Sequence, residues 1–140
     1  MSNINIGRVI LGGLVAGLII NFGEYVLNAI VLAAQWTAVT DSIHRPAVGM
    51  NQIMLFNALG FIEGIVAVWT YAAIRPRFGA GPRTAVYAAL LSWVTCYFLM
   101  NAYPTVMGII PVSMLVIMLA EGIVEIILAT IVGAWFYREA

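Results

Sequence analysis

The sequence has no lysine, one histidine and one cysteine among its 140 residues. Without lysine, no Schiff base to retinal or pyridoxal phosphate can form. Cys96 has no partner for an intramolecular disulfide, and its position in an apolar run predicts a small buried thiol. His44 lies in a polar stretch, which leaves the apolar runs without the usual axial ligand of a membrane haem. These absences lead us to predict no organic cofactor.

Charged residues are also scarce. They make up 9% of the chain against 64% hydrophobic residues, whereas a soluble domain is about a quarter charged. Four runs, at about 9–34, 52–74, 84–102 and 111–137, reach the roughly 20 residues needed to cross a hydrocarbon core about 30 Å thick. The sequence therefore predicts an all-α fold, a four-helix transmembrane bundle in which residues 1–140 form one integral membrane domain. We expect it in a bacterial inner membrane, surrounded by the lipid bilayer and without a nucleic-acid partner.

The first apolar run is predicted to remain in the protein as a helix. It is longer than the apolar region of a typical signal peptide. It also contains Asn21, Glu24 and Asn28, where a signal peptide would be uniformly apolar.

The arginines are distributed unevenly around the four predicted spans. Only Arg45 lies in the first predicted loop, and the third loop has none. Because basic residues accumulate on the cytoplasmic side, both termini and the loop RPRFGAGPR are predicted to be cytoplasmic, with His44 outside. The arginines on the predicted cytoplasmic side are Arg8, Arg75, Arg77, Arg83 and Arg138.

Four of the six acidic residues lie near the centres of the predicted spans, at Glu24, Glu63, Glu121 and Glu125. No basic residue lies at that depth to neutralise them. A charged side chain at the centre of a bilayer costs about 2.5–3.5 kcal/mol, so we expect some of these carboxyls to be protonated or to share a bound cation. Glu121 and Glu125 are one helical turn apart, which makes them the best candidates for the working centre.

Small and polar residues recur at intervals of three or four in the first, second and fourth spans, so each helix has one such face. Asparagines on these faces can supply neutral oxygen ligands or hydrogen-bond donors. Glycines spaced by four allow helix backbones to approach closely. The predicted cation or proton site comprises Glu24, Glu63, Glu121, Glu125, Asn21, Asn28 and Asn57, and the predicted helix-packing residues are Gly13, Gly17, Gly60, Gly64 and Gly122.

An internal repeat is a further hypothesis. The segment EGIV occurs at residues 63–66 and again at 121–124, and VLNA near the end of the first span has a loose echo in LMNA near the end of the third. Two repeated helical hairpins would give this pattern if the first loop had gained an insertion. That loop, beginning at Gln35, is predicted to contain a short helix at the membrane interface.

The predicted site leaves two interpretations open. Protonated carboxyls and amides can simply hydrogen-bond neighbouring helices together. Alternatively they form an all-oxygen site for a proton or for a hard cation such as Mg²⁺, Ca²⁺ or Mn²⁺. A di-iron site of the ferritin type is excluded, because no glutamate in a span is followed by histidine at the third position.

Three functions are consistent with these residues. The leading hypothesis is a transporter, channel or ion-linked module built on the carboxylates. The alternative is a structural accessory subunit that packs through its small-residue faces into a homo-oligomer or a larger membrane complex. An enzyme acting on a lipid or quinone is the third, although no nucleophile and base pair is visible.

Two stretches carry a resemblance. GLVAGLIINFGEYVLNAIVLA and YAAIRPRFGAGPRTA look like uncharacterised small bacterial membrane proteins with the same four-span layout, which implies no activity. Glu24 is placed like the first-span carboxylate of small multidrug transporters, but the rest of that pattern is missing. GGLVAG is similar to the first span of fluoride channels, yet their other motifs are missing too.

Overall fold

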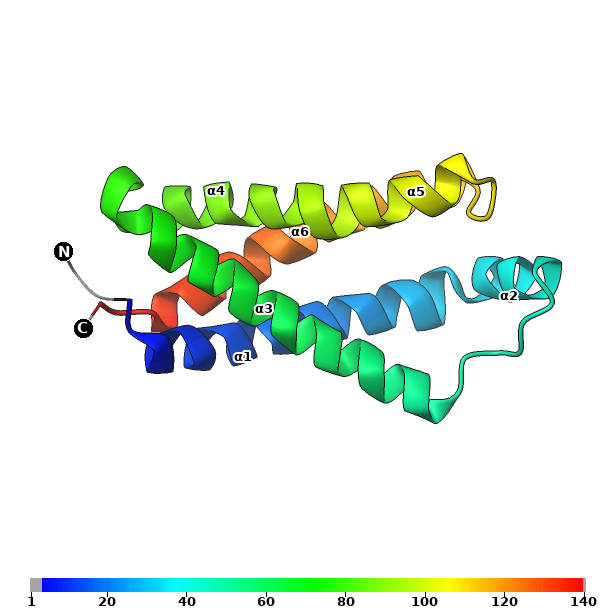
Figure 1. The fold of residues 1–140 in the computed structure, drawn as a ribbon, viewed down its shortest axis with the longest axis horizontal. Coiled ribbons are helices and arrows are strands. Elements are labelled where there is room, and N and C mark those ends of the chain that lie inside the picture. Colours follow the sequence, from blue (N-terminus) through cyan, green and yellow to red (C-terminus); the bar gives the residue numbers. More distant parts are fainter. Residues whose placement is uncertain (1–3, 140) are drawn as a thin grey trace.

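The computed structural model describes residues 4–139, and these are helical apart from short connections. Four helical stretches are long and apolar enough to cross a membrane: Ile6–Val31, Met50–Phe78, Pro82–Val106 and Val112–Phe136. The prediction of an all-α four-helix bundle is confirmed, and the structure supports an integral membrane protein. The elements in Figure 1 are α1 (Ile6–Tyr25), the π-helix η1 (Val26–Val31), α2 (Ala33–Ser42), α3 (Met50–Phe78), α4 (Pro82–Ser92), the π-helix η2 (Trp93–Leu99), α5 (Met100–Val106) and α6 (Val112–Phe136).

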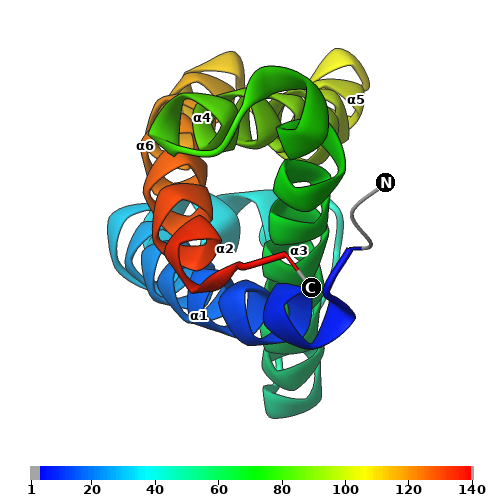
Figure 2. The ribbon, with the colours of Figure 1, turned by 90° about the vertical axis from the view of Figure 1, so that its left-hand side faces the viewer.

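Seen end-on, α1, α3, α4 and α6 form a ring in that order (Figure 2), with each helix packed on its two neighbours. The start of α1, the end of α6 and the turn between α3 and α4 lie at one end, which we call the terminal end. The connections 43–49 and 107–111 lie at the opposite end, together with α2, and we call this the loop end. Which end faces the cytoplasm stays a prediction.

The closest helix contact joins α1 and α3. A Cβ atom added to Gly64 would lie 2.5 Å from the backbone nitrogen of Gly17, and one added to Gly17 would lie 2.8 Å from the Cα of Phe61. A Cβ on Gly13 would meet the backbone of Ile65. These glycines therefore bring two helix backbones together within the chain, as their spacing predicts.

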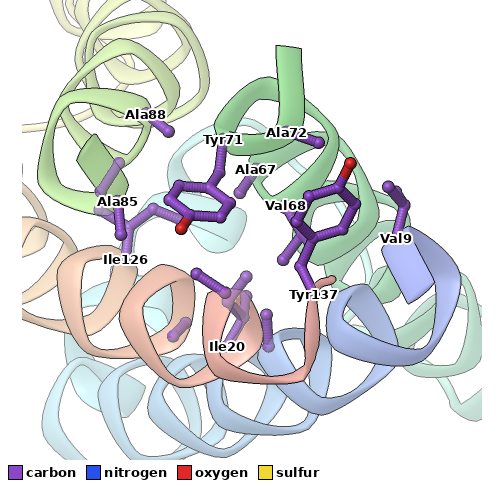
Figure 3. Packing of buried hydrophobic residues seen from close by; sticks show 14 of the residues in the cluster. Val9, Ile20, Ala67, Val68, Tyr71, Ala72, Ala85, Ala88, Ile126 and Tyr137 are labelled. Carbon is purple, nitrogen blue, oxygen red and sulfur yellow. The ribbon is translucent and has the colours of Figure 1, made fainter. Parts of the chain in front are cut away.

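The terminal half of the bundle has a tightly packed apolar core (Figure 3). Ala16, Val68, Ala85 and Ile126 from four different helices are completely buried. Alanines line much of this core and allow the helices to approach, while larger side chains fill the remaining space. No polar path through this half is visible among the core residues labelled in Figure 3 apart from the two tyrosine hydroxyls.

The loop half is more open. Residues 50–59, the first part of α3, are exposed on every face of the helix, and α3 crosses the other helices at a steep angle in Figure 1. In a bilayer these apolar side chains would face lipid or another helix. The carboxylates predicted from sequence lie beside this open half.

Two helices continue past the residues at which the sequence predicts the spans to end. The second predicted span ends at residue 74, but α3 contains Pro76 and stops only before Gly79, whose φ of 87° favours glycine. The third predicted span ends at residue 102, but α5 contains Pro104. Each proline lies near the C-terminal end of its helix, so any kink that it causes affects only the last residues of the helix. The predicted helix in the first loop is present as α2.

Candidate functional site

The most buried carboxyl group belongs to Glu125 on α6, which is only 4% exposed. The Tyr97 hydroxyl on η2 donates a hydrogen bond of 2.6 Å to its Oε1. Its Oε2 is buried and has no hydrogen-bond partner within residues 4–139. One oxygen of this carboxyl group is thus fixed by the protein, and the other is free to hold a proton.

Helix α1 approaches this group at Gly23. A Cβ atom there would lie 2.7 Å from the carboxyl carbon of Glu125 and 3.0 Å from Oε1 of Glu121. Any larger residue would displace these side chains, so glycine creates the space in which both carboxyls contact α1. Glu24 follows directly and lies close enough to Glu121 and Glu125 for their charges to interact.

Glu24 belongs to a chain of hydrogen bonds that leads to the loop end. The Asn28 amide donates both to the Glu24 carboxylate and, at 3.0 Å, to the Glu24 backbone oxygen. Trp36 on α2 donates to Oδ1 of Asn28 at 2.8 Å. The amide of Asn28 therefore connects the Trp36 indole with the carboxyl group of Glu24 near the end of α1.

Both π-helices lie at this site. Asn28 lies in η1, and Asn101 follows η2 and donates to the Tyr97 backbone oxygen at 2.8 Å. In each case an asparagine amide bonds to the carbonyl four residues earlier, in a segment whose backbone pattern is wider than that of an α-helix. Asn57 makes the same kind of bond within the ordinary α-helix α3, so this similarity does not bear on the repeat of VLNA and LMNA, which stays a prediction.

Glu63 on α3 lies at the edge of the same region. Its Oε1 is buried without a hydrogen-bond partner in the described chain. Its charge would interact with that of Glu24, and the Cys96 thiol lies beside it. Cys96 itself is exposed, so the prediction of a buried thiol is wrong. The π-helical turn at η2 directs Tyr97 inward, and its neighbour Cys96 consequently lies at the surface.

Asn21 and Asn57 hydrogen-bond away from the carboxylates. The Asn21 amide donates to the backbone oxygen of Asn57 at 3.1 Å, and the Asn57 amide donates to the backbone oxygen of Ile53 at 2.8 Å. A Cβ on Gly60 would lie 2.5 Å from Oδ1 of Asn21. These asparagines connect α1 with α3 and supply no hydrogen bond to a predicted carboxylate.

The described residues contain no group of three or more His, Cys, Asp or Glu side chains arranged to hold a metal ion. The prediction that several carboxylates share one hard cation gains no support from this geometry. Two of the carboxyls instead accept hydrogen bonds from neutral groups, Glu125 from the Tyr97 hydroxyl and Glu24 from the Asn28 amide.

Sequence reasoning missed Tyr97 and Trp36 as contributors. A tyrosine buried in a membrane helix must find a hydrogen-bond partner, and carboxyl groups are strong acceptors at that depth. Gly122 also belongs to this contact, because a Cβ there would lie 2.6 Å from Cε1 of Tyr97. The small residue on α6 provides the space that receives the tyrosine ring.

In comparisons with known proteins, no protein family, curated protein or solved structure matches the chain.

Proposed function

We propose that the chain is a small bacterial inner-membrane protein that binds and releases a proton at Glu125. One observation supports this above all: a carboxyl group that is 4% exposed has one oxygen bonded to Tyr97 and the other without a partner. A buried carboxylate ion would be costly there, while the protonated acid is neutral.

The neighbouring carboxyls favour a protonated Glu125 over one that is permanently ionised. Glu24 and Glu121 lie close enough to Glu125 for their charges to interact. The hydrogen bond to the Glu125 carboxyl comes from a tyrosine hydroxyl and not from a basic side chain. Carboxyls this close do not all ionise independently, so taking up a proton at one affects the others. The group therefore acts as one proton-binding unit.

Access to this unit is proposed to be one-sided. Trp36, Asn28 and Glu24 form a hydrogen-bonded chain from the loop end. Towards the terminal end, Ile126 and Ala129 belong to a buried and mainly apolar core, in which the hydroxyls of Thr84 and Thr130 are isolated polar groups. This arrangement suits an ion-linked module that responds to protons from one face, because a channel needs a polar path through both halves.

An accessory subunit is the second candidate. It is favoured by residues 50–59 of α3, which are exposed on every face and could accept a partner helix. The glycine faces that were predicted to pack against a partner are already used within the chain, because Gly13 packs on α3 and Gly64 packs on α1.

Proton uptake by protein reconstituted in vesicles would test the proposal. After a rapid pH step, we expect a burst on the order of one proton per chain, since the coupled carboxyls share protons. Glu125→Gln should reduce the burst, because glutamine keeps the acceptor for Tyr97 but cannot titrate. Asp41→Asn, which removes an exposed acid in α2, is the matched control and should leave the burst unchanged.

Two results would contradict the proposal. Equal bursts from the parent and Glu125→Gln would exclude Glu125 as the proton site. A sustained flux that collapses the pH gradient would indicate a channel and overturn the one-sided path.

A further inference from the structure

A second group of polar side chains lies at the terminal end, away from the carboxylates. Arg75 in the last turns of α3 places its guanidinium carbon 5.5 Å from the ring centroid of Tyr137, just after α6. The Tyr137 ring meets that of Tyr71 edge-on, with centroids 6.0 Å apart. Figure 3 shows the two tyrosines side by side, with their hydroxyls pointing in different directions.

The donors of this pair are unused. Nη1 of Arg75 and the hydroxyl of Tyr137 are buried and have no hydrogen-bond partner among residues 4–139. Tyr137 is only 5% exposed. Arg75 forms an ion pair with Glu139, whose Oε1 lies 3.8 Å from Nε, but this distance is too long for a hydrogen bond and leaves Nη1 without an acceptor. An arginine and a tyrosine hydroxyl left without acceptors are costly unless a ligand supplies them.

A comparison within the same end of the bundle shows that this is unusual. Arg83 also lies over an aromatic ring, with its guanidinium carbon 5.9 Å from the centroid of Tyr87. There, however, Nε donates to the Tyr87 hydroxyl at 3.0 Å, and both residues are exposed. The guanidinium donors of Arg83 find acceptors in its aromatic partner and in solvent, whereas Nη1 of Arg75 has no acceptor within residues 4–139.

We infer that Arg75 and Tyr137 bind a phosphate group, supplied by the headgroup of an anionic membrane lipid. A guanidinium and a hydroxyl are donors that match phosphate oxygens. Both residues lie at helix ends, where a bundle of membrane-spanning helices meets the headgroups. The Arg75 side chain is 22% exposed although its Nη1 is buried, so a phosphate would approach from the exposed side of the guanidinium and reach the buried donors after a side-chain shift. Nearby Arg8, Arg77, Arg83 and Arg138 would attract anionic lipids to this end.

Native mass spectrometry of the full chain in detergent would measure the binding of phosphatidylglycerol, phosphatidylcholine and inorganic phosphate. We expect phosphatidylglycerol to bind the parent most tightly. Tyr137→Phe and Arg75→Gln should each weaken its binding about tenfold, because each removes a hydrogen bond to a charged group. Arg83→Gln is the matched control, since it removes the same charge from the same end and should weaken binding less than about twofold.

Tyr137→Phe is the decisive variant, because phenylalanine keeps the ring that contacts Arg75 and Tyr71 and loses only the hydroxyl. A purely structural role for this tyrosine would leave lipid binding unchanged in that variant, which would overturn the inference. Equal weakening by Arg83→Gln would also overturn it, since it would indicate general charge attraction. If inorganic phosphate bound as tightly as phosphatidylglycerol, the assignment to a lipid would be wrong. Should Arg75→Gln fail to fold, the comparison of Tyr137→Phe with Arg83→Gln still decides.

Discussion

Replacing Gly64 by valine should strongly destabilise the bundle. The new Cβ would lie 2.5 Å from the backbone nitrogen and 2.9 Å from the Cα of Gly17. Backbone atoms of a packed helix cannot move aside as the end of a flexible side chain can. The contact between α1 and α3 would have to open, at a cost of about 3 kcal/mol or more. Unfolding by added SDS in mixed micelles, followed by circular dichroism, measures the loss.

Gly7→Ala is the matched control for this substitution. Gly7 also lies in a membrane helix, but it is exposed, and an added Cβ would lie 3.6 Å from Oδ1 of Asn5, an ordinary van der Waals contact. We expect it to be neutral or slightly stabilising, because alanine is the better helix former. If Gly64→Val were as stable as Gly7→Ala, the close packing of α1 on α3 would be wrong.

Removing the hydrogen bond between Tyr97 and Glu125 should have the next largest effect on stability. Tyr97→Phe removes the donor of the 2.6 Å hydrogen bond, and Glu125→Leu removes the acceptor. Each single change leaves a buried polar group unpaired, at a cost of about 1–3 kcal/mol. The double variant leaves neither, so it should be more stable than the sum of the single changes predicts, by about 1 kcal/mol.

The same unfolding experiment provides this double-mutant cycle. Thr95→Val on η2 is a useful control, since the Thr95 hydroxyl bonds only to backbone oxygens of its own helix besides a contact with Cys96. Its effect should be additive with that of Glu125→Leu. Additivity between Tyr97→Phe and Glu125→Leu would instead mean that the hydrogen bond contributes nothing.

The four-span fold could be predicted because the thickness of a bilayer sets the number of apolar residues that a spanning helix needs. The glycine spacing at Gly13, Gly17, Gly60 and Gly64 likewise indicated close helix contacts, and these form between α1 and α3. The sequence could not show that the first part of α3 diverges from the bundle. The large apolar side chains of this segment are accommodated equally well by lipid and by protein, so the pattern does not distinguish the two.

The candidate site was predicted in part. A carboxylate inside a membrane span is costly wherever it points, which made Glu24 and Glu125 visible from sequence. The direction of Tyr97 was not, because helical periodicity assumes 3.6 residues per turn, and η2 departs from it. Cys96 was expected to be buried because it lies in an apolar run, but such a run does not show which side chains the protein covers, and Cys96 lies at the surface. Asn21 and Asn57 were predicted to supply ligands at the site, but their amides bond to the backbone and Asn57 is exposed.

The central claim is that Glu125 binds and releases a proton within the bundle, and infrared difference spectroscopy of the protein in bilayers tests it most directly. Spectra of the parent recorded between about pH 4 and 9, a range that spans carboxyl and histidine titrations in water, should show a carboxyl stretching band that changes with pH. Tyr97→Phe should shift the frequency of this band, because the hydrogen bond to the carboxyl oxygen is lost. Glu125→Gln should lack it. A band that is identical in the parent and in Glu125→Gln, or no pH-dependent carboxyl band in the parent, would contradict the claim.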